Sequence, residues 1–86
     1  MKNLKAITIK KDFYTNEKEC VMDAQLIYDE THECQLIFKK KRKYIIVQGS
    51  VFSQTEIGSS PIRQNYENNC WEFRGWVDDR GCFKNN

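Results

Sequence analysis

Apolar and polar residues alternate along much of the chain, which is the pattern of half-buried β-strands. In CVMDAQLIY (residues 20–28) all even-numbered positions are apolar, whereas Asp23 and Gln25 fall on the odd side. Four further segments have strand character through alternation or through β-branched and aromatic residues. They are AITI (6–9), CQLIF (34–38, with Cys34, Leu36 and Phe38 on one side), YIIVQGSVF (44–52) and CWEFRGWV (70–77, with Trp71, Phe73 and Val77 on one side). We therefore expect about five strands.

The segment at residues 17–30 also fits a helix. Asn16 followed by Glu19 resembles a capping box, in which the first side chain caps the helix and the second reaches back. A set of apolar residues then falls on one helical face: Cys20, Val21, Ala24, Ile27 and Tyr28. Met22 and Leu26 lie outside this face, so we favour a strand for the second half of the segment.

The sequences between these strands are typical of short turns. DETHE (29–33) is predicted to be a polar hairpin loop, and KKKRK (39–43) must turn the chain between strands that end near Phe38 and begin near Tyr44. DDRG (78–81) fits a turn with Gly81 in the left-handed conformation. Gly75 within the last strand indicates a bulge or tight bend.

The stretch at residues 53–69 has no strand character. Ser60 is a suitable helix cap, and proline is tolerated at the first helical position, which here is Pro61. Ile62 and Tyr66 would then share one helical face. We predict a short helical turn near residues 60–67, with an ordered loop lying across the sheet as the alternative.

Together these elements predict one small domain spanning residues 1–86, of the all-β or β-rich α+β class. Five strands with short hairpins fit a small antiparallel barrel or a curved sheet. No apolar run approaches the roughly 18 to 20 residues of a membrane span, so no membrane contact is expected. The N-terminus has no apolar run of export-signal length, and we expect a cytoplasmic location.

Four cysteines are present: Cys20, Cys34, Cys70 and Cys82. A cytoplasmic chain keeps its thiols reduced, so free thiols are expected rather than two disulfides. A zinc site formed by His32 with some of these cysteines is the alternative. Structural zinc sites usually contain a Cys-x-x-Cys pair, which this chain lacks. We therefore expect no metal and no cofactor.

Charge is unevenly distributed along the chain. The net charge is +2 and residues 39–43 contribute +5, so the other 81 residues sum to −3. Residues 15–33 carry six acidic side chains against Lys18 alone, a balance of −5. The basic run has three interpretations: a solvated turn that protects edge strands from aggregation, a contact for phosphates, or a contact for an acidic protein surface.

Catalytic signals are weak, and we predict that the protein is not an enzyme. The single histidine lies in an acidic segment, and neither a nucleophile motif nor a phosphate-binding glycine loop is present. His32 and Cys34 lack a third residue that would orient them as a nucleophile and base.

Binding is the remaining class of function. We predict contacts with a protein partner that has an acidic surface, as in small inhibitors or adaptors, including those of phages and mobile elements. The alternative is a nucleic-acid-binding β module that uses the basic hairpin and nearby aromatic rings, among them Tyr14. Association of the acidic 15–33 and basic 39–43 segments of two copies is a further prediction. The predicted contact residues are Lys39, Lys40, Lys41, Arg42, Lys43, Tyr66, Arg74 and Trp76.

Trp76 is ambiguous on the pattern alone. Strict alternation puts it on the side of Glu72 and Arg74, opposite Trp71 and Phe73. A large ring on a polar side is either covered by another part of the chain or used in a contact. We favour burial beneath the 53–69 stretch.

Overall fold

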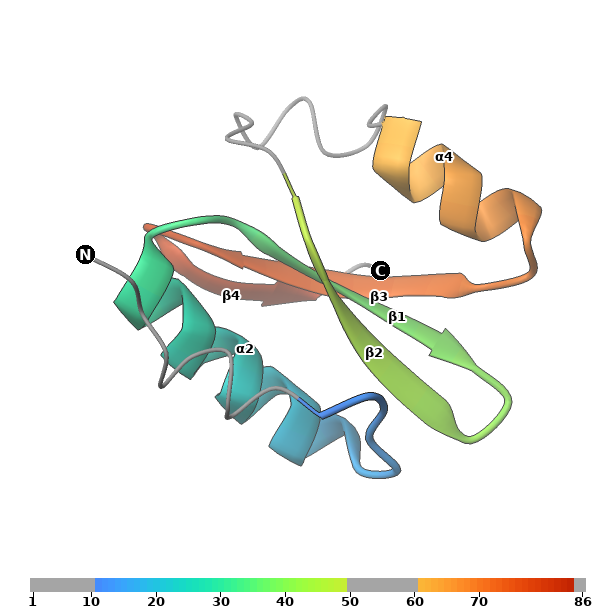
Figure 1. Cartoon of the computed structure of the whole chain (residues 1–86), viewed down its shortest axis with the longest axis horizontal. Coiled ribbons are helices and arrows are strands. Elements are labelled where there is room, and N and C mark those ends of the chain that lie inside the picture. Colours follow the sequence, from blue (N-terminus) through green and yellow to red (C-terminus); the bar gives the residue numbers. More distant parts are fainter. Residues whose placement is uncertain (1–10, 50–60, 85–86) are drawn as a thin grey trace.

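The computed structural model describes residues 11–49 and 61–84 (Figure 1). Within these ranges the chain forms a β-rich α+β fold, with two helices and one antiparallel sheet of four strands in the order β2-β1-β3-β4. The sheet does not close into a barrel, and neither a barrel nor a fifth strand is confirmed. The elements in chain order are α2 (Glu17–Thr31), β1 (Gln35–Lys40), β2 (Lys43–Gln48), α4 (Pro61–Asn68), β3 (Glu72–Asp78) and β4 (Gly81–Lys84).

Residues 17–31 form a helix, which was the alternative for this segment, so the strand favoured for its second half is wrong. The Asn16 side chain caps the helix by accepting a hydrogen bond from the Glu19 backbone N–H at 3.1 Å. Cys20, Ala24 and Ile27 are buried at helical spacing, whereas Met22 and Leu26 are exposed. The pattern was misleading because Cys20 and Ala24 satisfy both periods.

The predicted loop at residues 29–33 is mostly helix as well. Asp29–Thr31 complete the last turn of α2, and His32 ends it in the left-handed conformation (φ 58°). The His32 backbone N–H donates to the Tyr28 carbonyl at 2.6 Å, which satisfies one of the last free carbonyls of the helix.

The predicted strand CQLIF is confirmed as the centre of the fold. β1 pairs with β2 on one side and β3 on the other, and its residues from Gln35 to Phe38 are all buried. Alternation sends Ile37 toward α2 and Leu36 and Phe38 to the opposite face. The sheet therefore has apolar clusters on both faces, and Figure 1 shows α2 and α4 on opposite sides of it.

The cluster under α2 joins the helix to the sheet. Its buried members are Tyr14, Cys20, Ala24, Ile27, Ile37, Ile46 and Val77. The Tyr14 hydroxyl donates to the Asp23 carboxylate at 2.7 Å, so this buried phenol has a partner. Tyr14 also exchanges two backbone hydrogen bonds of 2.7 Å with Tyr44, which fixes the segment before α2 along the outer edge of β2.

The predicted helix near residues 60–67 is confirmed as α4, and Ile62 and Tyr66 both pack on the sheet as expected. The Tyr66 ring stacks on Phe38, with centroids 4.8 Å apart. The proposed cap Ser60 lies outside the described residues. The predicted strand AITI and the end of YIIVQGSVF also lie outside them.

A bulge in β3 corrects the predicted faces of that strand. The pairing of β3 with β1 shifts register between Ile37 and Phe38, so Ile37 faces Gly75 while Phe38 faces Phe73. Arg74 is the extra residue, and beyond it every side chain changes face. Val77 therefore joins the cluster under α2, and Trp76 lies with Phe73 on the other face. The bulge expected at Gly75 is present, but its effect on Trp76 and Val77 was not anticipated.

The predicted DDRG turn is also present. It joins β3 to the short strand β4, which the sequence pattern did not reveal. Gly81 has a φ of 120°, a conformation that glycine adopts without strain. The Asp78 carboxylate accepts from the Arg80 backbone N–H at 2.8 Å, which stabilises the turn.

Candidate partner-binding site at the basic hairpin

The five cations of residues 39–43 form the hairpin between β1 and β2, as predicted. Lys40 pairs with Lys43 across the strands, and Lys41 and Arg42 make the two-residue turn. Lys41 has a φ of 58°, in the left-handed region that disfavours side chains larger than glycine or asparagine. A lysine thus occupies the turn position that glycine would occupy with less strain.

Three of the cations lie over aromatic rings. The Lys40 ammonium is 5.6 Å from the centroid of Trp71, and the Lys43 ammonium is 4.9 Å from that of Phe13. Lys39 lies 5.5 Å from the centroid of its cross-strand neighbour Tyr44. Each such contact contributes about 0.5–1 kcal/mol at an exposed site. Lys43 is exposed, and Lys39 and Lys40 are partly exposed, so these side chains are close to solvent.

None of the five cations forms an ion pair with a carboxylate in the described ranges. Ion pairs elsewhere in those ranges join Lys11 to Glu19, Arg63 to Glu67, Arg74 to Glu17 and Glu72, and Arg80 to Asp78. The hairpin charge is therefore not neutralised by the carboxylates of that part of the chain. It is available to an external anion.

An open hollow of about 710 Å³ lies beside the hairpin. Alternation places Lys40, Lys43 and Ile45 on the same face of the hairpin, and these residues form part of its wall. The remaining lining residues are Asp12, Phe13, Lys41, Arg42 and Trp71. We call this hollow the basic groove: it combines four cations with three apolar side chains and one carboxylate.

Four predicted contact residues do not line the basic groove: Lys39, Tyr66, Arg74 and Trp76. The Arg74 guanidinium donates to Glu72 at 2.9 Å and to Glu17 at 3.1 Å, and these hydrogen bonds raise its pKa. Trp76 stacks between Phe73 and Phe83 on the α4 side of the sheet. Tyr66 contacts the groove wall indirectly, through its edge contact with Trp71. Partner contacts by these four residues stay a prediction.

Sequence reasoning missed the apolar walls of the groove. Phe13 precedes α2, and Trp71 precedes β3, so neither is near the basic run in the sequence. Trp71 reaches Lys40 because β3 pairs with β1 and places Glu72 opposite Lys39. The missing signal was the order of strands in the sheet.

The molecule is electrically polarised along β1. The hairpin lies at the C-terminal end of this strand, whereas its first residue Gln35 pairs with Val77, next to Asp78. Asp78 and Asp79 lie near Tyr28, whose pKa is raised by burial and then by these carboxylates. Basic and acidic groups thus occupy opposite ends of the strand.

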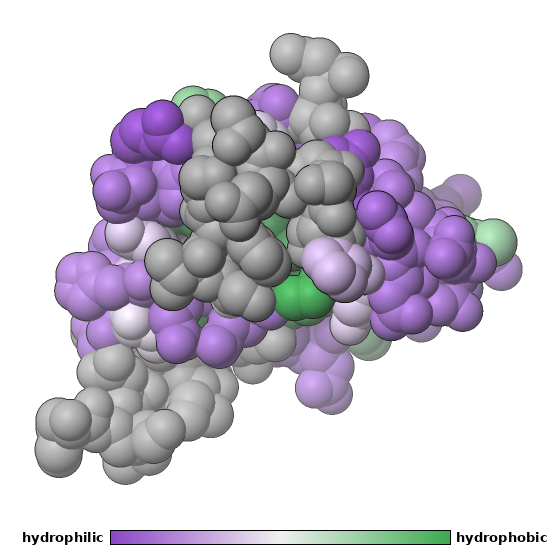
Figure 2. Space-filling model, turned by 90° about the horizontal axis from the view of Figure 1, so that it is seen from above, coloured by the Kyte–Doolittle hydropathy of each residue, from purple (hydrophilic) through white to green (hydrophobic). Residues whose placement is uncertain are grey.

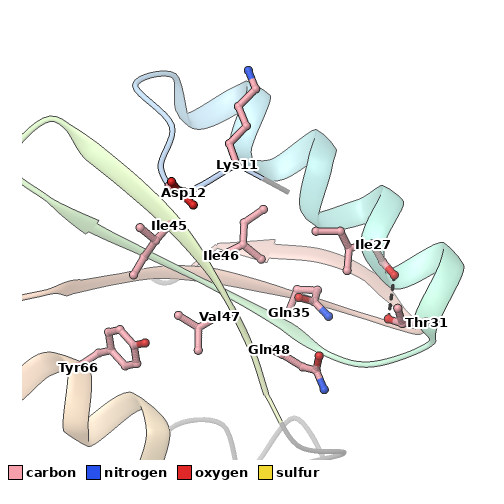
Figure 3. Close-up of a pocket in the computed structure, with 10 residues that line it drawn as sticks. All are labelled: Lys11, Asp12, Ile27, Thr31, Gln35, Ile45, Ile46, Val47, Gln48 and Tyr66. Carbon is pink, nitrogen blue, oxygen red and sulfur yellow. Dashed lines mark hydrogen bonds between the residues drawn. The ribbon is translucent and has the colours of Figure 1, made fainter. Parts of the chain in front are cut away.

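A second hollow, of about 550 Å³, follows β2 (Figure 3). Ile27 and Ile46 line it on the α2 side, whereas Val47 and Tyr66 line it on the α4 side. It therefore extends around an edge strand and lies on both faces of the sheet. Among the described residues that line it, the charged ones are Lys11 and Asp12.

The four cysteines differ in burial, which bears on the reactivity of their thiols. All four are free; Cys20 and Cys34 are buried, and Cys70 and Cys82 are exposed. Burial raises the pKa of Cys34 to about 11, which keeps its thiol neutral near pH 7, whereas a nucleophile requires a lowered pKa. Among residues 11–49 and 61–84, no group of three or more His, Cys, Asp or Glu side chains is placed to hold a metal ion.

Comparisons of the chain with protein-family models, with curated proteins and with solved structures found no match. No helix in the described part of the chain is long and apolar enough to cross a membrane. Figure 2 shows that the described residues around the rim of the face seen from above are mainly hydrophilic. The basic groove is therefore the feature of the molecule that bears most directly on function.

Proposed function

We propose that this chain is a non-enzymatic binding protein that docks its basic groove on an acidic surface of another protein, as an inhibitor or adaptor. The observation that carries the proposal is the combination of four cations, unpaired with described carboxylates, and the apolar side chains of Phe13, Ile45 and Trp71 in one open hollow. Aromatic and arginine side chains dominate the binding energy of protein interfaces, and complementary charge accelerates association and sets orientation.

Acidic residues elsewhere on the molecule favour a compact acidic partner over a long polyanion. The chain carries −3 outside the hairpin run. A long nucleic acid would be repelled wherever it left the basic groove, whereas a protein with a local acidic patch would not. The open shape of the groove also suits a protein surface.

The test compares two variants that lose the same charge. Lys41→Gln/Arg42→Gln neutralises the turn, and Arg80→Gln/Lys84→Gln neutralises two exposed cations at β4 and the turn before it. Each is used to capture partners from a lysate of the source cell, with and without nuclease. We expect the turn variant to lose a nuclease-resistant partner that the β4 variant and the wild type retain. Equal capture by all three proteins would make the hairpin a solvated turn.

Single-stranded nucleic acid is a second candidate, favoured by the placement of Lys40 over Trp71 and Lys43 over Phe13. Bases stack on aromatic rings while nearby cations contact phosphates. The distinguishing measurement is the salt dependence of binding to single-stranded and duplex oligonucleotides. Contacts with about three to five phosphates predict a log-log slope of roughly −3 to −4 on duplex DNA. Micromolar binding that disappears when residues 39–43 are all changed to glutamine would replace the protein-binding proposal.

A further inference from the structure

Three large apolar side chains in the described part of the chain are exposed, and they fall on two surfaces of opposite charge. Phe13 is 46% exposed and lines the basic groove. Met22 is 58% exposed and Leu26 is 46% exposed, and both lie on α2. An exposed apolar side chain is not unusual alone, but neighbouring ones that form a stripe indicate a contact surface.

Met22 and Leu26 form the centre of such a stripe. They are four residues apart, so their side chains are neighbours on the helix surface. They point away from the sheet because Cys20, Ala24 and Ile27 are the buried residues of the same helix. Exposed acidic residues lie at both ends of the stripe, with Glu19 one turn before Met22 and Asp29 one turn after Leu26. We call these four residues the acidic stripe. Glu19 is paired with Lys11 at 2.6 Å, and exposed Lys18 also lies one turn before Met22, so the negative charge of the stripe is concentrated at its Asp29 end.

The acidic stripe and the basic groove complement each other in two ways. Each has an apolar centre, Met22 and Leu26 in one and Phe13, Ile45 and Trp71 in the other. Four cations and one carboxylate border the apolar centre of the groove, whereas the negative charge of the stripe is concentrated at Asp29. Within one molecule the two surfaces cannot meet, because the stripe points away from the sheet while the groove includes Ile45 and Trp71 from the cluster on the opposite face.

We propose that a second copy of this chain is a partner of the basic groove, and that it docks through the acidic stripe of its α2. This inference rests on the proposed function, because it names one partner for the same groove. The contact is heterologous: each copy presents a groove to one neighbour and a stripe to another, so association continues into short chains or a ring. One helix face in an open groove buries less area than a stable dimer requires, so the contact is weak and concentration-dependent.

The test uses two variants, each with one surface removed. Lys41→Glu/Arg42→Glu reverses charge at the groove, and Met22→Gln/Leu26→Gln removes the apolar centre of the stripe while keeping residues that favour helix. Arg80→Glu/Lys84→Glu is the charge-matched control. Circular dichroism and thermal melting confirm that each variant is folded. Sedimentation equilibrium at protein concentrations from about 10 μM to about 1 mM covers the range of weak contacts.

We expect wild type and control to gain average mass with concentration, and to lose this gain at high salt because exposed charges are screened. Each surface variant alone stays monomeric, with at least about a tenfold weaker association constant. An equimolar mixture of the two surface variants restores association but stops at a 1:1 complex, because each retains the surface that the other lacks. A limit of two copies in the mixture is expected only when the contact joins two different surfaces, as in a heterologous contact.

Three outcomes overturn the inference. If the wild type is monomeric over the whole concentration range, the inference of self-association is wrong. The proposed function is then tested separately, by partner capture with the Lys41→Gln/Arg42→Gln variant. Loss of association in the stripe variant but not in the groove variant indicates a helix-to-helix dimer instead. A mixture that stays monomeric, although wild type associates, shows that stripe and groove do not bind each other.

Discussion

The rings of Phe73 and Trp76 lie nearly parallel, with planes 7° and centroids 6.0 Å apart, although an unbroken strand would send residues three apart to opposite faces. The bulge at Arg74 and Gly75 brings them to the same side. Trp76 is also stacked on Phe83 of β4, with centroids 5.2 Å apart. One extra residue thus decides which aromatic side chains cover the α4 face.

Gly75→Ala should destabilise the protein by more than about 2 kcal/mol, because overpacking shifts backbone as well as side chains. A Cβ atom at this position would lie 2.3 Å from the Phe83 carbonyl oxygen, so β4 would have to move away from β3. Gly49→Ala is the control, because its nearest contact would be an ordinary 3.5 Å to Leu36. Urea denaturation of both variants checks the difference, and equal stabilities would contradict the tight packing of β3 on β4.

Trp76→Ala should lose about 2–4 kcal/mol of stability, somewhat below the cost of truncating a fully buried aromatic residue. The ring is packed between Phe73 and Phe83, and its Nε1–H donates to Asp78 at 3.2 Å. Trp76→Phe keeps the stacking and loses the hydrogen bond, so it should lose about 1 kcal/mol. A normal melting curve for the alanine variant, together with lost partner binding, would instead make Trp76 a contact residue.

The sequence correctly predicted the elements in which the spacing of apolar residues fits either a helix or a strand but not both. Lys39–Lys43 had to turn the chain because strands flank it on both sides, and Pro61 with Ile62 and Tyr66 fits the start of a short helix. Helix α2 was misjudged because Met22 and Leu26 are apolar yet exposed. Period-2 alternation counted them as core residues, whereas the structure leaves them on the outer face of the helix.

The cations of the basic groove were predicted from the sequence, but its apolar residues were not. Its cations are consecutive in the sequence and were identified at once. Its apolar walls come from Phe13 and Trp71, which the pairing of β1 with β3 and the Tyr14–Tyr44 bridge bring to the hairpin. Pairing between distant strands leaves no mark in a single sequence, so a site that combines local charge with distant rings appears there as charge alone.

Asn16→Ala should lose about 1 kcal/mol, the usual effect of removing a helix cap. The Asn16 side chain accepts from the Glu19 backbone N–H, and in alanine this donor has no side-chain partner. Asn16→Asp should retain the cap and add a favourable negative charge at the positive end of the helix dipole. Thermal melting with far-ultraviolet circular dichroism tests both; an alanine variant as stable as wild type would show that the cap contributes nothing.

Stability should fall as the pH rises above about 9. Burial raises the pKa of Cys20 to about 12 and that of Cys34 to about 11, from the ordinary value of 9.0. The unfolded chain therefore releases these protons at a lower pH than the folded chain, which favours unfolding between pH 9 and 12. Below pH 9 both states are protonated and this contribution is constant.

Urea midpoints measured at pH 7, 9 and 10.5 test the pH dependence. Cys20→Ala should show a smaller decrease between pH 9 and 10.5 than wild type. Some decrease should persist, because burial also raises the pKa of Tyr14. An identical decrease in the Cys20→Ala variant would mean that this thiol ionises equally readily in both states.

Lys41→Gly should stabilise the protein by about 0.5–1 kcal/mol although it removes a side chain. The φ of 58° at Lys41 is strained for lysine and not for glycine, and this relief exceeds the entropy that glycine adds to the unfolded chain. The opposite result is expected for Arg42→Gly, because Arg42 is not among the residues of positive φ in the described ranges, and there glycine only adds entropy to the unfolded state. Both variants lose one positive charge, so a difference between them reports the backbone and not the electrostatics. Partner binding should weaken equally in the two variants, because each loses one charge of the turn. Equal weakening with unequal stability would separate the effect of the turn's charge from that of its conformation. If Lys41→Gly were less stable than Arg42→Gly, the left-handed conformation at Lys41 would be contradicted.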